Sequence, residues 1–221
     1  MRRHAATAVV LALLVGTAIA FAETERLKLK PTPIEESFVE PAFSPVCGCA
    51  QSRAEIRLRL HRADTVTVRI QNAEGETVRT LERRLPRGRT TLYWDGRDNS
   101  GGPAPDGRYR IDVELAGADR AFRLPQQTAL DTVAPSARVV SARESGGVGQ
   151  LFRITYRVTE PAHGLLYVNG VKRVGPTYTK RRAAQLQWRP RRAGRYRLQF
   201  AAVDLAGNFS PRSPVFVVRV R

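Results

Sequence analysis

The stretch AEIRLRLHRADTVTVRI, residues 54–70, decides the fold because apolar side chains recur in it at every second position. One alternating run ends at Leu60 and a second ends at Ile70, with the polar residues 61–65 between them. Alternation of this period is typical of strands that bury one face and expose the other. The stretch therefore predicts two consecutive β-strands.

Further strands are expected for the same reason over residues 77–81, 90–94, 109–115, 152–158, 184–188, 195–203 and 215–220. The tetrapeptide VNGV at residues 168–171 sets Asn-Gly between apolar residues, which is the strongest short signal for a β-hairpin. Short strands, regular turns and no helical stretch predict an all-β chain. With about 90 residues per unit, we expect two tandem antiparallel Ig-like β-sandwiches after an N-terminal segment.

The chain divides into four segments. Residues 1–22 join a basic start to an uncharged apolar run and end in small residues, which predicts either a cleaved signal peptide or an uncleaved membrane anchor formed by residues 5–22. Either outcome places the remainder in the cell envelope or outside the cell. Residues 23–46 are rich in Pro and Glu and predict an extended linker, while the Pro-bounded stretch 125–136 predicts a boundary between sandwiches at 47–131 and 132–221.

A short sequence motif is repeated in the two units. The tetrapeptide GRYR occurs at residues 107–110 and again at 194–197, and a tryptophan precedes each copy, Trp94 in the first unit and Trp188 in the second. We expect one architecture used twice, with Tyr109 and Tyr196 near the start of a late strand and each tryptophan on the strand before it.

The run WDGRD at residues 94–98, followed by DGRY at 106–109, resembles the Ig-like domain of the flagellar hook-capping protein FlgD over residues 43–124. The resemblance implies that one turn leaves a strand at Asp95 and Gly96. It also implies that Asp106 and Gly107 lead the chain into the next strand with Tyr109 inward. DTVAP at 131–135 and VDLAGN at 203–208 are similar to bacterial Ig-like repeats.

What the resemblance implies is an exported binding or spacer module without catalytic residues. A flagellar hook-assembly protein is a minority alternative, because the long polar segment that precedes this domain in the hook-capping protein is replaced here by the export signal. Residues 43–45, FSP, resemble the opening F-S-P of the family, which usually continues with Asn, Asp and Gly. Here CGCAQS stands at residues 47–52, which removes the carboxylates of a calcium loop.

The two cysteines, Cys47 and Cys49, have three expected states in an oxidising compartment. They pair with each other, pair with a second chain, or remain free. No His or Lys lies near them in the sequence to activate a thiol, so we favour a disulfide over a redox site.

Composition and motifs argue against an enzyme or a metalloprotein. Three His and two Cys cannot supply a four-ligand zinc site of the Cys/His kind, and the acidic residues of the loop 95–106 lack the spacing of an EF-hand. No nucleophile or phosphate-loop motif is present, so we expect no catalytic residue, no metal and no cofactor. The remaining enzymatic alternative is an exported hydrolase that assembles a triad through space around His61 or His163.

Charge is distributed unevenly. The formal net charge is +17; residues 23–131 carry 18 Lys+Arg and 17 Asp+Glu, whereas residues 132–221 carry 17 Lys+Arg and only three acids. Ten of the basic residues crowd into a stretch without any carboxylate: Lys172, Arg173, Lys180, Arg181, Arg182, Arg189, Arg191, Arg192, Arg195 and Arg197. Such a field attracts polyanions.

Two interpretations of this charge stay open. The basic stretch is either a solvated polar face on an arginine-rich sandwich or a binding surface for a polyanion. The expected partner is an anionic envelope polymer or another envelope protein. Binding to nucleic acid is expected in vitro through phosphate contacts, and binding to a membrane only through the N-terminal segment.

Overall fold

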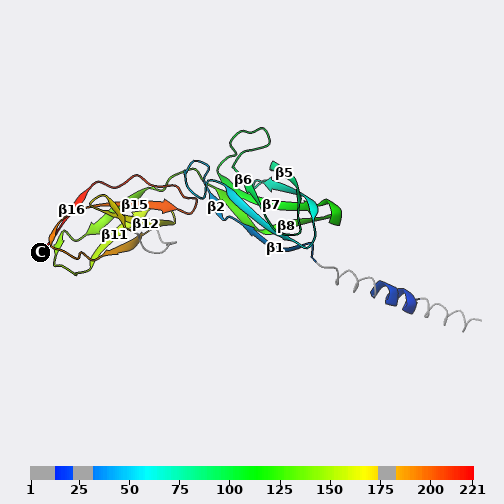
Figure 1. The fold of residues 1–221 in the computed structure, drawn as a ribbon, viewed down its shortest axis with the longest axis horizontal. Helices are drawn as coiled ribbons and strands as arrows, with labels where there is room; N and C mark the ends of the chain where they lie inside the picture. Colours follow the sequence, from blue (N-terminus) through cyan, green and yellow to red (C-terminus); the bar gives the residue numbers. More distant parts are fainter. Residues whose placement is uncertain (1–12, 22–31, 174–182) are drawn as a thin grey trace, which may run out of the picture.

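The computed structural model describes residues 13–21, 32–173 and 183–221. Residues 13–21 form a short exposed helix, and the rest of the predicted signal or anchor lies outside the described residues. None of the helices in the described ranges is both long and apolar enough to cross a membrane. Beyond this segment two β-sandwiches follow each other end to end (Figure 1).

The first sandwich pairs a three-stranded sheet with a five-stranded sheet. The smaller sheet has the order β1-β3-β6 and consists of β1 (Ile34–Val39), β3 (Ala54–Leu60) and β6 (Gly88–Trp94). The larger has the order β2-β8-β7-β4-β5 and consists of β2 (Ala42–Phe43), β8 (Arg120–Leu130), β7 (Gly107–Leu115), β4 (Asp64–Gln71) and β5 (Thr77–Leu85). A 3₁₀ turn, η1 (Ala116–Ala118), joins β7 to β8.

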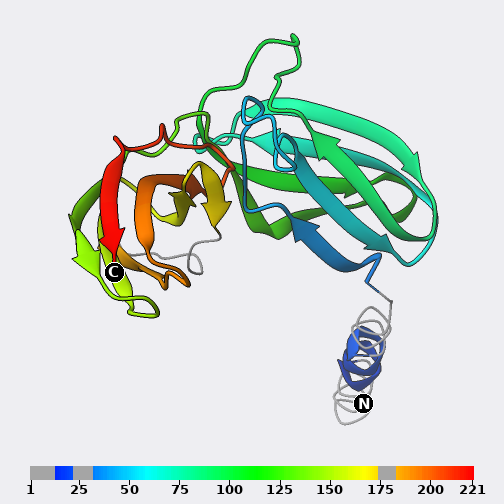
Figure 2. The same ribbon diagram turned by 60° about the vertical axis from the view of Figure 1, so that its left-hand side comes forward.

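The second sandwich has the same composition of sheets. Its smaller sheet runs β14-β11-β9, with β14 (Ala183–Trp188), β11 (Phe152–Val158) and β9 (Ala137–Ala142). Its larger sheet runs β10-β16-β15-β12-β13, with β10 (Ser145–Gly146), β16 (Phe216–Val220), β15 (Gly194–Asp204), β12 (Ala162–Val168) and β13 (Val171–Arg173). Figure 2 shows the two sandwiches as separate units joined by a short connection.

The two topologies correspond strand for strand. β1 through β8 map in chain order onto β9 through β16, and even the single parallel pairing recurs, β2 with β8 in the first unit and β10 with β16 in the second. The predicted fold class, two tandem antiparallel Ig-like sandwiches, is confirmed. The repeated GRYR motif therefore reflects one architecture used twice.

Each sandwich has its own core, built by the alternation seen in the sequence. Along β4 every second residue is buried, and Val66, Val68 and Ile70 are fully inaccessible to solvent. In the second unit Phe152, Ile154 and Tyr156 do the same on β11. Burial of one such side chain stabilises a fold by about 1.5–3 kcal/mol. The row on β4 therefore stabilises the first sandwich, and the row on β11 stabilises the second.

The Asn-Gly hairpin is confirmed. Val168 and Val171 pair across β12 and β13, and Asn169 and Gly170 both have positive φ, 51° and 81°. A two-residue turn of this kind matches the right-handed twist of the flanking strands, which explains the preference for Asn-Gly.

The expected linker over residues 23–46 is wrong for its second half. β1 pairs antiparallel with β3, and Phe43 is completely buried, so the first sandwich begins at Ile34 rather than at Cys47. The sequence does not predict β1 because Glu35 and Glu36 interrupt the alternation of apolar residues, and because this edge strand buries few of its side chains.

The stretch 125–136 also differs from its expected irregular structure. β8 continues through Pro125 to Leu130, and the register between β7 and β8 shifts between Arg110 and Asp112, opposite the residues around this proline. Such irregularities are where a sheet tolerates proline, because the ladder bond that proline cannot donate is already interrupted. Only residues 131–136 connect the sandwiches without strand structure.

Candidate functional site: the domain junction and a basic pocket

Each sandwich contains the same arrangement of tryptophan and tyrosine. Trp94 on β6 meets Tyr109 on β7 edge to face at 4.7 Å, and Trp188 on β14 meets Tyr196 on β15 in the same way at 5.0 Å. Each tyrosine hydroxyl donates a hydrogen bond to the carbonyl four residues upstream, of Pro105 or of Arg192. This is the tyrosine corner of Ig-like folds, and it fixes the loop that enters each late strand.

The carboxylates in the loop after Trp94 accept hydrogen bonds from neighbouring residues of the same loop. Arg97 N donates to Asp95 Oδ1 at 3.1 Å, and the carboxylate of Asp98 accepts bonds from Ser100 and from Gly102 N. These bonds, with the Ser100 hydroxyl foremost, lower the pKa of Asp98. Gly96 has a φ of 78°, and a Cβ there would meet the side chain of Pro45.

Asp106 and Gly107 connect the first sandwich to the segment that follows it. The carboxylate of Asp106 accepts bonds from Thr132 N and Thr132 Oγ1 at 3.0 and 2.9 Å, while Gly107 begins β7. The Asp-Gly pair that brings Tyr109 inward thus also holds the start of the interdomain connection.

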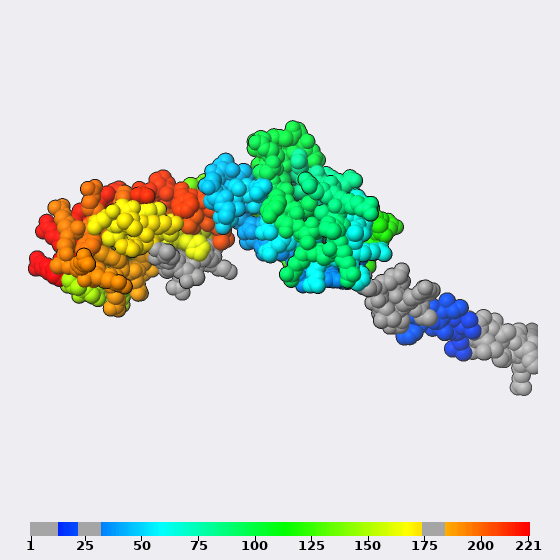
Figure 3. Space-filling model, viewed as in Figure 1, coloured from blue at the N-terminus to red at the C-terminus, as the bar shows by residue number. Residues whose placement is uncertain are grey.

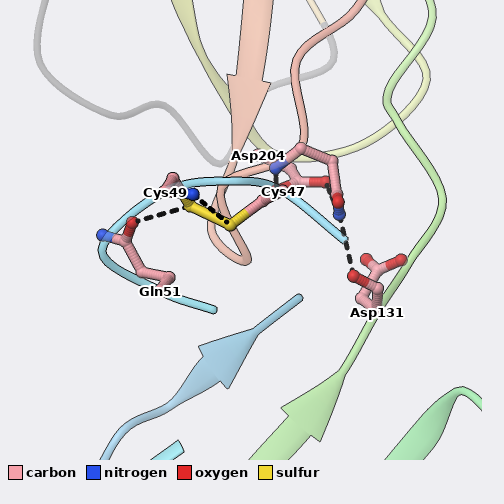
Figure 4. The surroundings of a disulfide bond; sticks show 6 residues. Cys47, Cys49, Gln51, Asp131 and Asp204 are labelled. Carbon is pink, nitrogen blue, oxygen red and sulfur yellow. Dashed lines mark hydrogen bonds between the residues drawn. A yellow bond between two sulfur atoms is a disulfide. The ribbon is translucent and has the colours of Figure 1, made fainter. Parts of the chain in front are cut away.

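Cys47 and Cys49 form a disulfide with each other, in the loop between β2 and β3. The disulfide faces the second sandwich, where a Cβ built on Gly207 would overlap Cys49 Sγ and lie 3.5 Å from Cys47 Sγ. Figure 4 shows this loop beside Asp204 and Asp131. In the space-filling view the light-blue residues near position 50 meet the orange end of the second sandwich (Figure 3).

Asn208 completes the junction. Its Nδ2 donates to the carbonyl of Asp131 at 2.8 Å and to Asp204 Oδ2 at 2.9 Å, while its backbone N donates to Asp204 Oδ1. The turn after β15 is therefore hydrogen-bonded both to its own strand and to the first residue of the connecting segment.

Three carboxylates converge at the same place. Asp131, Glu160 and Asp204 have carboxylate oxygens within 4.8 Å of one another. Burial, followed by the charges of neighbouring carboxylates, raises the pKa of both Asp131 and Glu160. Sequence reasoning missed this cluster and the role of Asn208, although the DTVAP and DLAGN motifs contain most of its residues.

The structure describes seven of the ten predicted polyanion-binding residues, all of them in the second sandwich. Lys180, Arg181 and Arg182 lie outside the described residues. Lys172 does not line the pocket described below, and its Nζ lies 5.6 Å from the ring centre of Phe209. Arg195 and Arg197 are exposed on β15.

The remaining arginines form an open pocket of about 550 Å³. We name it the arginine pocket and define it by Arg173, Trp188, Arg189, Arg191, Arg192 and Tyr196, all of which line it. Among the described residues every ion pair formed by an arginine lies in the first sandwich, for example Arg69 with Glu114 and Arg123 with Asp112. The described arginines of the second sandwich have no carboxylate within 4.0 Å, so their charge is not neutralised within this part of the chain.

The two histidines of the enzymatic alternative lie in different sandwiches. His61 is exposed, and its Nδ1 is 3.1 Å from Glu35 Oε1, a carboxylate that also pairs with Arg59. His163 is half-buried on β12.

Fold and site together define a protein built of tandem Ig-like or fibronectin III-like modules. Residues 49–119 match the model of the FlgD Ig-like domain family. No curated protein matches the chain. The fibronectin 1–3 domains of chicken CNTN1 superpose with a TM-score of 0.50 at 12% identity, over 87% of this chain and 69% of that one, which shows a shared fold alone.

Two further solved structures show weaker similarity. The fibronectin(III)-like modules of Clostridium thermocellum CbhA give a TM-score of 0.49 at 12% identity, over 85% of this chain and 93% of that one. The BSP domain of a biofilm-associated protein gives 0.33 at 17% identity, over 85% of this chain and 30% of that one.

Proposed function

We propose that this protein is a non-enzymatic, exported interaction and spacer module of the cell envelope or the extracellular space. The observation that carries the proposal is the junction, where the disulfide loop of one sandwich lies against Gly207 of the next and Asn208 bonds to Asp131. Contacts of this kind hold two binding modules at a set spacing and angle. The family of residues 49–119 and the apolar N-terminal run support the same function.

Cell fractionation with mass spectrometry of the native N-terminus tests the export. We expect the protein in the envelope or the medium, beginning after residue 20 or 22 if the segment is cleaved and at residue 1 or 2 if it acts as an anchor. A purely cytoplasmic protein with an intact N-terminus would contradict it.

A second candidate function is polyanion binding by the basic sandwich. The observation that favours it is the set of arginines in residues 132–221 without carboxylate partners among the described residues. Binding governed by such charge weakens steeply with salt, because each neutralised anion releases a counterion. Retention of the full chain on an anionic resin at physiological ionic strength, with a steep salt dependence, is the expected result; elution in the void volume would exclude it.

A further inference from the structure

The equivalent tryptophans of the two sandwiches differ in one hydrogen bond. Trp94 Nε1 donates to the carbonyl of Arg97 at 2.8 Å. Trp188 Nε1 donates to no acceptor among the described residues, although its ring packs against Tyr196 as Trp94 packs against Tyr109. The acceptor lies three residues beyond Trp94, in the turn at Gly96, which has a φ of 78°. Arg189 and Pro190 follow Trp188 instead, in a loop of seven residues before Tyr196 rather than fourteen.

The shorter loop carries arginines on a fixed backbone. Tyr196 holds the carbonyl of Arg192 at 2.8 Å, and Gly149 N donates to the carbonyl of the buried Pro190 at 2.8 Å. Arg191 and Arg192 project from this fixed backbone and are exposed. The backbone positions from which their guanidinium groups extend are therefore fixed, which lowers the backbone part of the ordering cost of binding an anion.

The pocket offers donors rather than a stacking surface. The indole of Trp188 lies edge to face with Tyr196 and 5.4 Å from the tilted ring of Phe152, so neighbouring rings already occupy much of its surface. Single-stranded nucleic acids depend on open aromatic faces for base stacking. A compact oxyanion instead needs an N–H and guanidinium groups, and Trp188 with Arg173, Arg191 and Arg192 supplies both kinds of donor.

We propose that the arginine pocket is a specific site for an oxyanion carried on a sugar polymer, that is, an anionic polysaccharide. The anionic group lies among Arg173, Arg191 and Arg192 and accepts a hydrogen bond from Trp188 Nε1. The sugar to which the anion is attached contacts the partly exposed rims of Trp188 and Tyr196. This inference rests on the second candidate function and gives it a site and a ligand class.

Calorimetric titration of the full chain with oligomers of polygalacturonate and of dextran sulfate tests the site. Neutral dextran and a dT oligonucleotide are the comparison ligands. We expect both anionic sugars to bind, neutral dextran not to bind, and the oligonucleotide to bind more weakly at equal charge. Preferential binding of the oligonucleotide would overturn the proposal in favour of nucleic acid.

Matched variants separate a site from diffuse attraction. Arg191→Ala with Arg192→Ala is expected to raise Kd about 30-fold or more, because charge-assisted hydrogen bonds are lost. Arg138→Ala with Arg157→Ala removes the same charge from exposed residues paired in register on β9 and β11, and is expected to change Kd less than about threefold. Equal losses would overturn the pocket but leave polyanion binding intact, whereas no binding by the wild type would overturn both.

The indole donor has its own control. Trp188→Phe is expected to raise Kd about tenfold, whereas Trp94→Phe, whose N–H already has an acceptor, is expected to leave Kd unchanged. Thermal unfolding of both variants verifies that each is folded at the titration temperature. If Trp188→Phe is folded and binds as tightly as the wild type, the hydrogen bond assigned to the indole is wrong.

Discussion

Gly207 of the second sandwich lies directly against Cys49 of the first. A methyl group built on Gly207 would overlap Cys49 Sγ, and the φ of Gly207, 93°, is one that other residues rarely adopt. The turn after β15 therefore has room for glycine alone as long as the disulfide loop stays where it is. This contact joins two units that otherwise have independent cores.

The substitution Gly207→Ala is predicted to change the junction. Positive φ alone destabilises an alanine by roughly 1 kcal/mol, and the overlap with Cys49 adds a displacement of one sandwich from the other. Gly170→Ala is the matched control, because Gly170 has a φ of 81° but nothing within 4 Å of its Cβ position. Both variants should unfold at lower temperature, and only Gly207→Ala should alter the small-angle scattering. Identical scattering from both would show that the contact does not set the domain arrangement.

Removal of the disulfide by Cys47→Ser with Cys49→Ser is predicted to loosen the junction and to spare both cores. The loop packs on Gly207 and does not contribute to either hydrophobic cluster. Amide hydrogen exchange should therefore accelerate at residues 204–208, while the strands β4 and β11 keep their protection. Unchanged exchange at residues 204–208 would show that the disulfide loop does not stabilise the turn after β15.

The carboxylate cluster predicts a stability that falls as pH rises. Because the pKa of Glu160 is raised in the folded protein, the folded state binds more protons than the unfolded state between the ordinary and the raised pKa. The stabilising contribution is complete below the ordinary carboxyl pKa of about 4.3 and is lost as pH rises through the raised pKa. Asp131 acts in the same direction.

Glu160→Gln should therefore be more stable than the wild type at pH 7, by no more than about 1 kcal/mol, and should lose less stability between pH 4 and pH 7. Glu144→Gln, at an exposed position in the same sandwich, is the control for charge. Denaturant titrations across this range provide the measurement. If the free energy of unfolding of Glu160→Gln changes with pH as that of the wild type does, the cluster does not resist ionisation.

The sequence predicted the fold wherever burial follows a simple period. Ile56, Val68 and Ile154 belong to rows with strict alternation, and their strands were found within a few residues. β1 was missed because an edge strand can carry Glu35 and Glu36 without cost to the core. β8 was cut short because proline argues against a strand unless the register irregularity beside it is known.

The site was less accessible from the sequence for a physical reason. GRYR predicted the aromatic pairs because Trp and Tyr stand at the same positions of the same strands in both units. Asp131, Glu160 and Asp204 come from three segments that are distant in the sequence, and only the folded chain brings their carboxylates together. The contrast between Trp94 and Trp188 depends on where one backbone carbonyl lies, which residue type does not encode.

Small-angle scattering from the full chain, measured with the disulfide intact and again after reduction, tests most directly whether the two sandwiches form one spacer. We predict that one end-to-end arrangement fits the scattering curve of the oxidised protein, and that reduction broadens the distribution of interdomain distances. An oxidised curve that requires many orientations of the two sandwiches, or a curve that does not change on reduction, would contradict a rigid spacer.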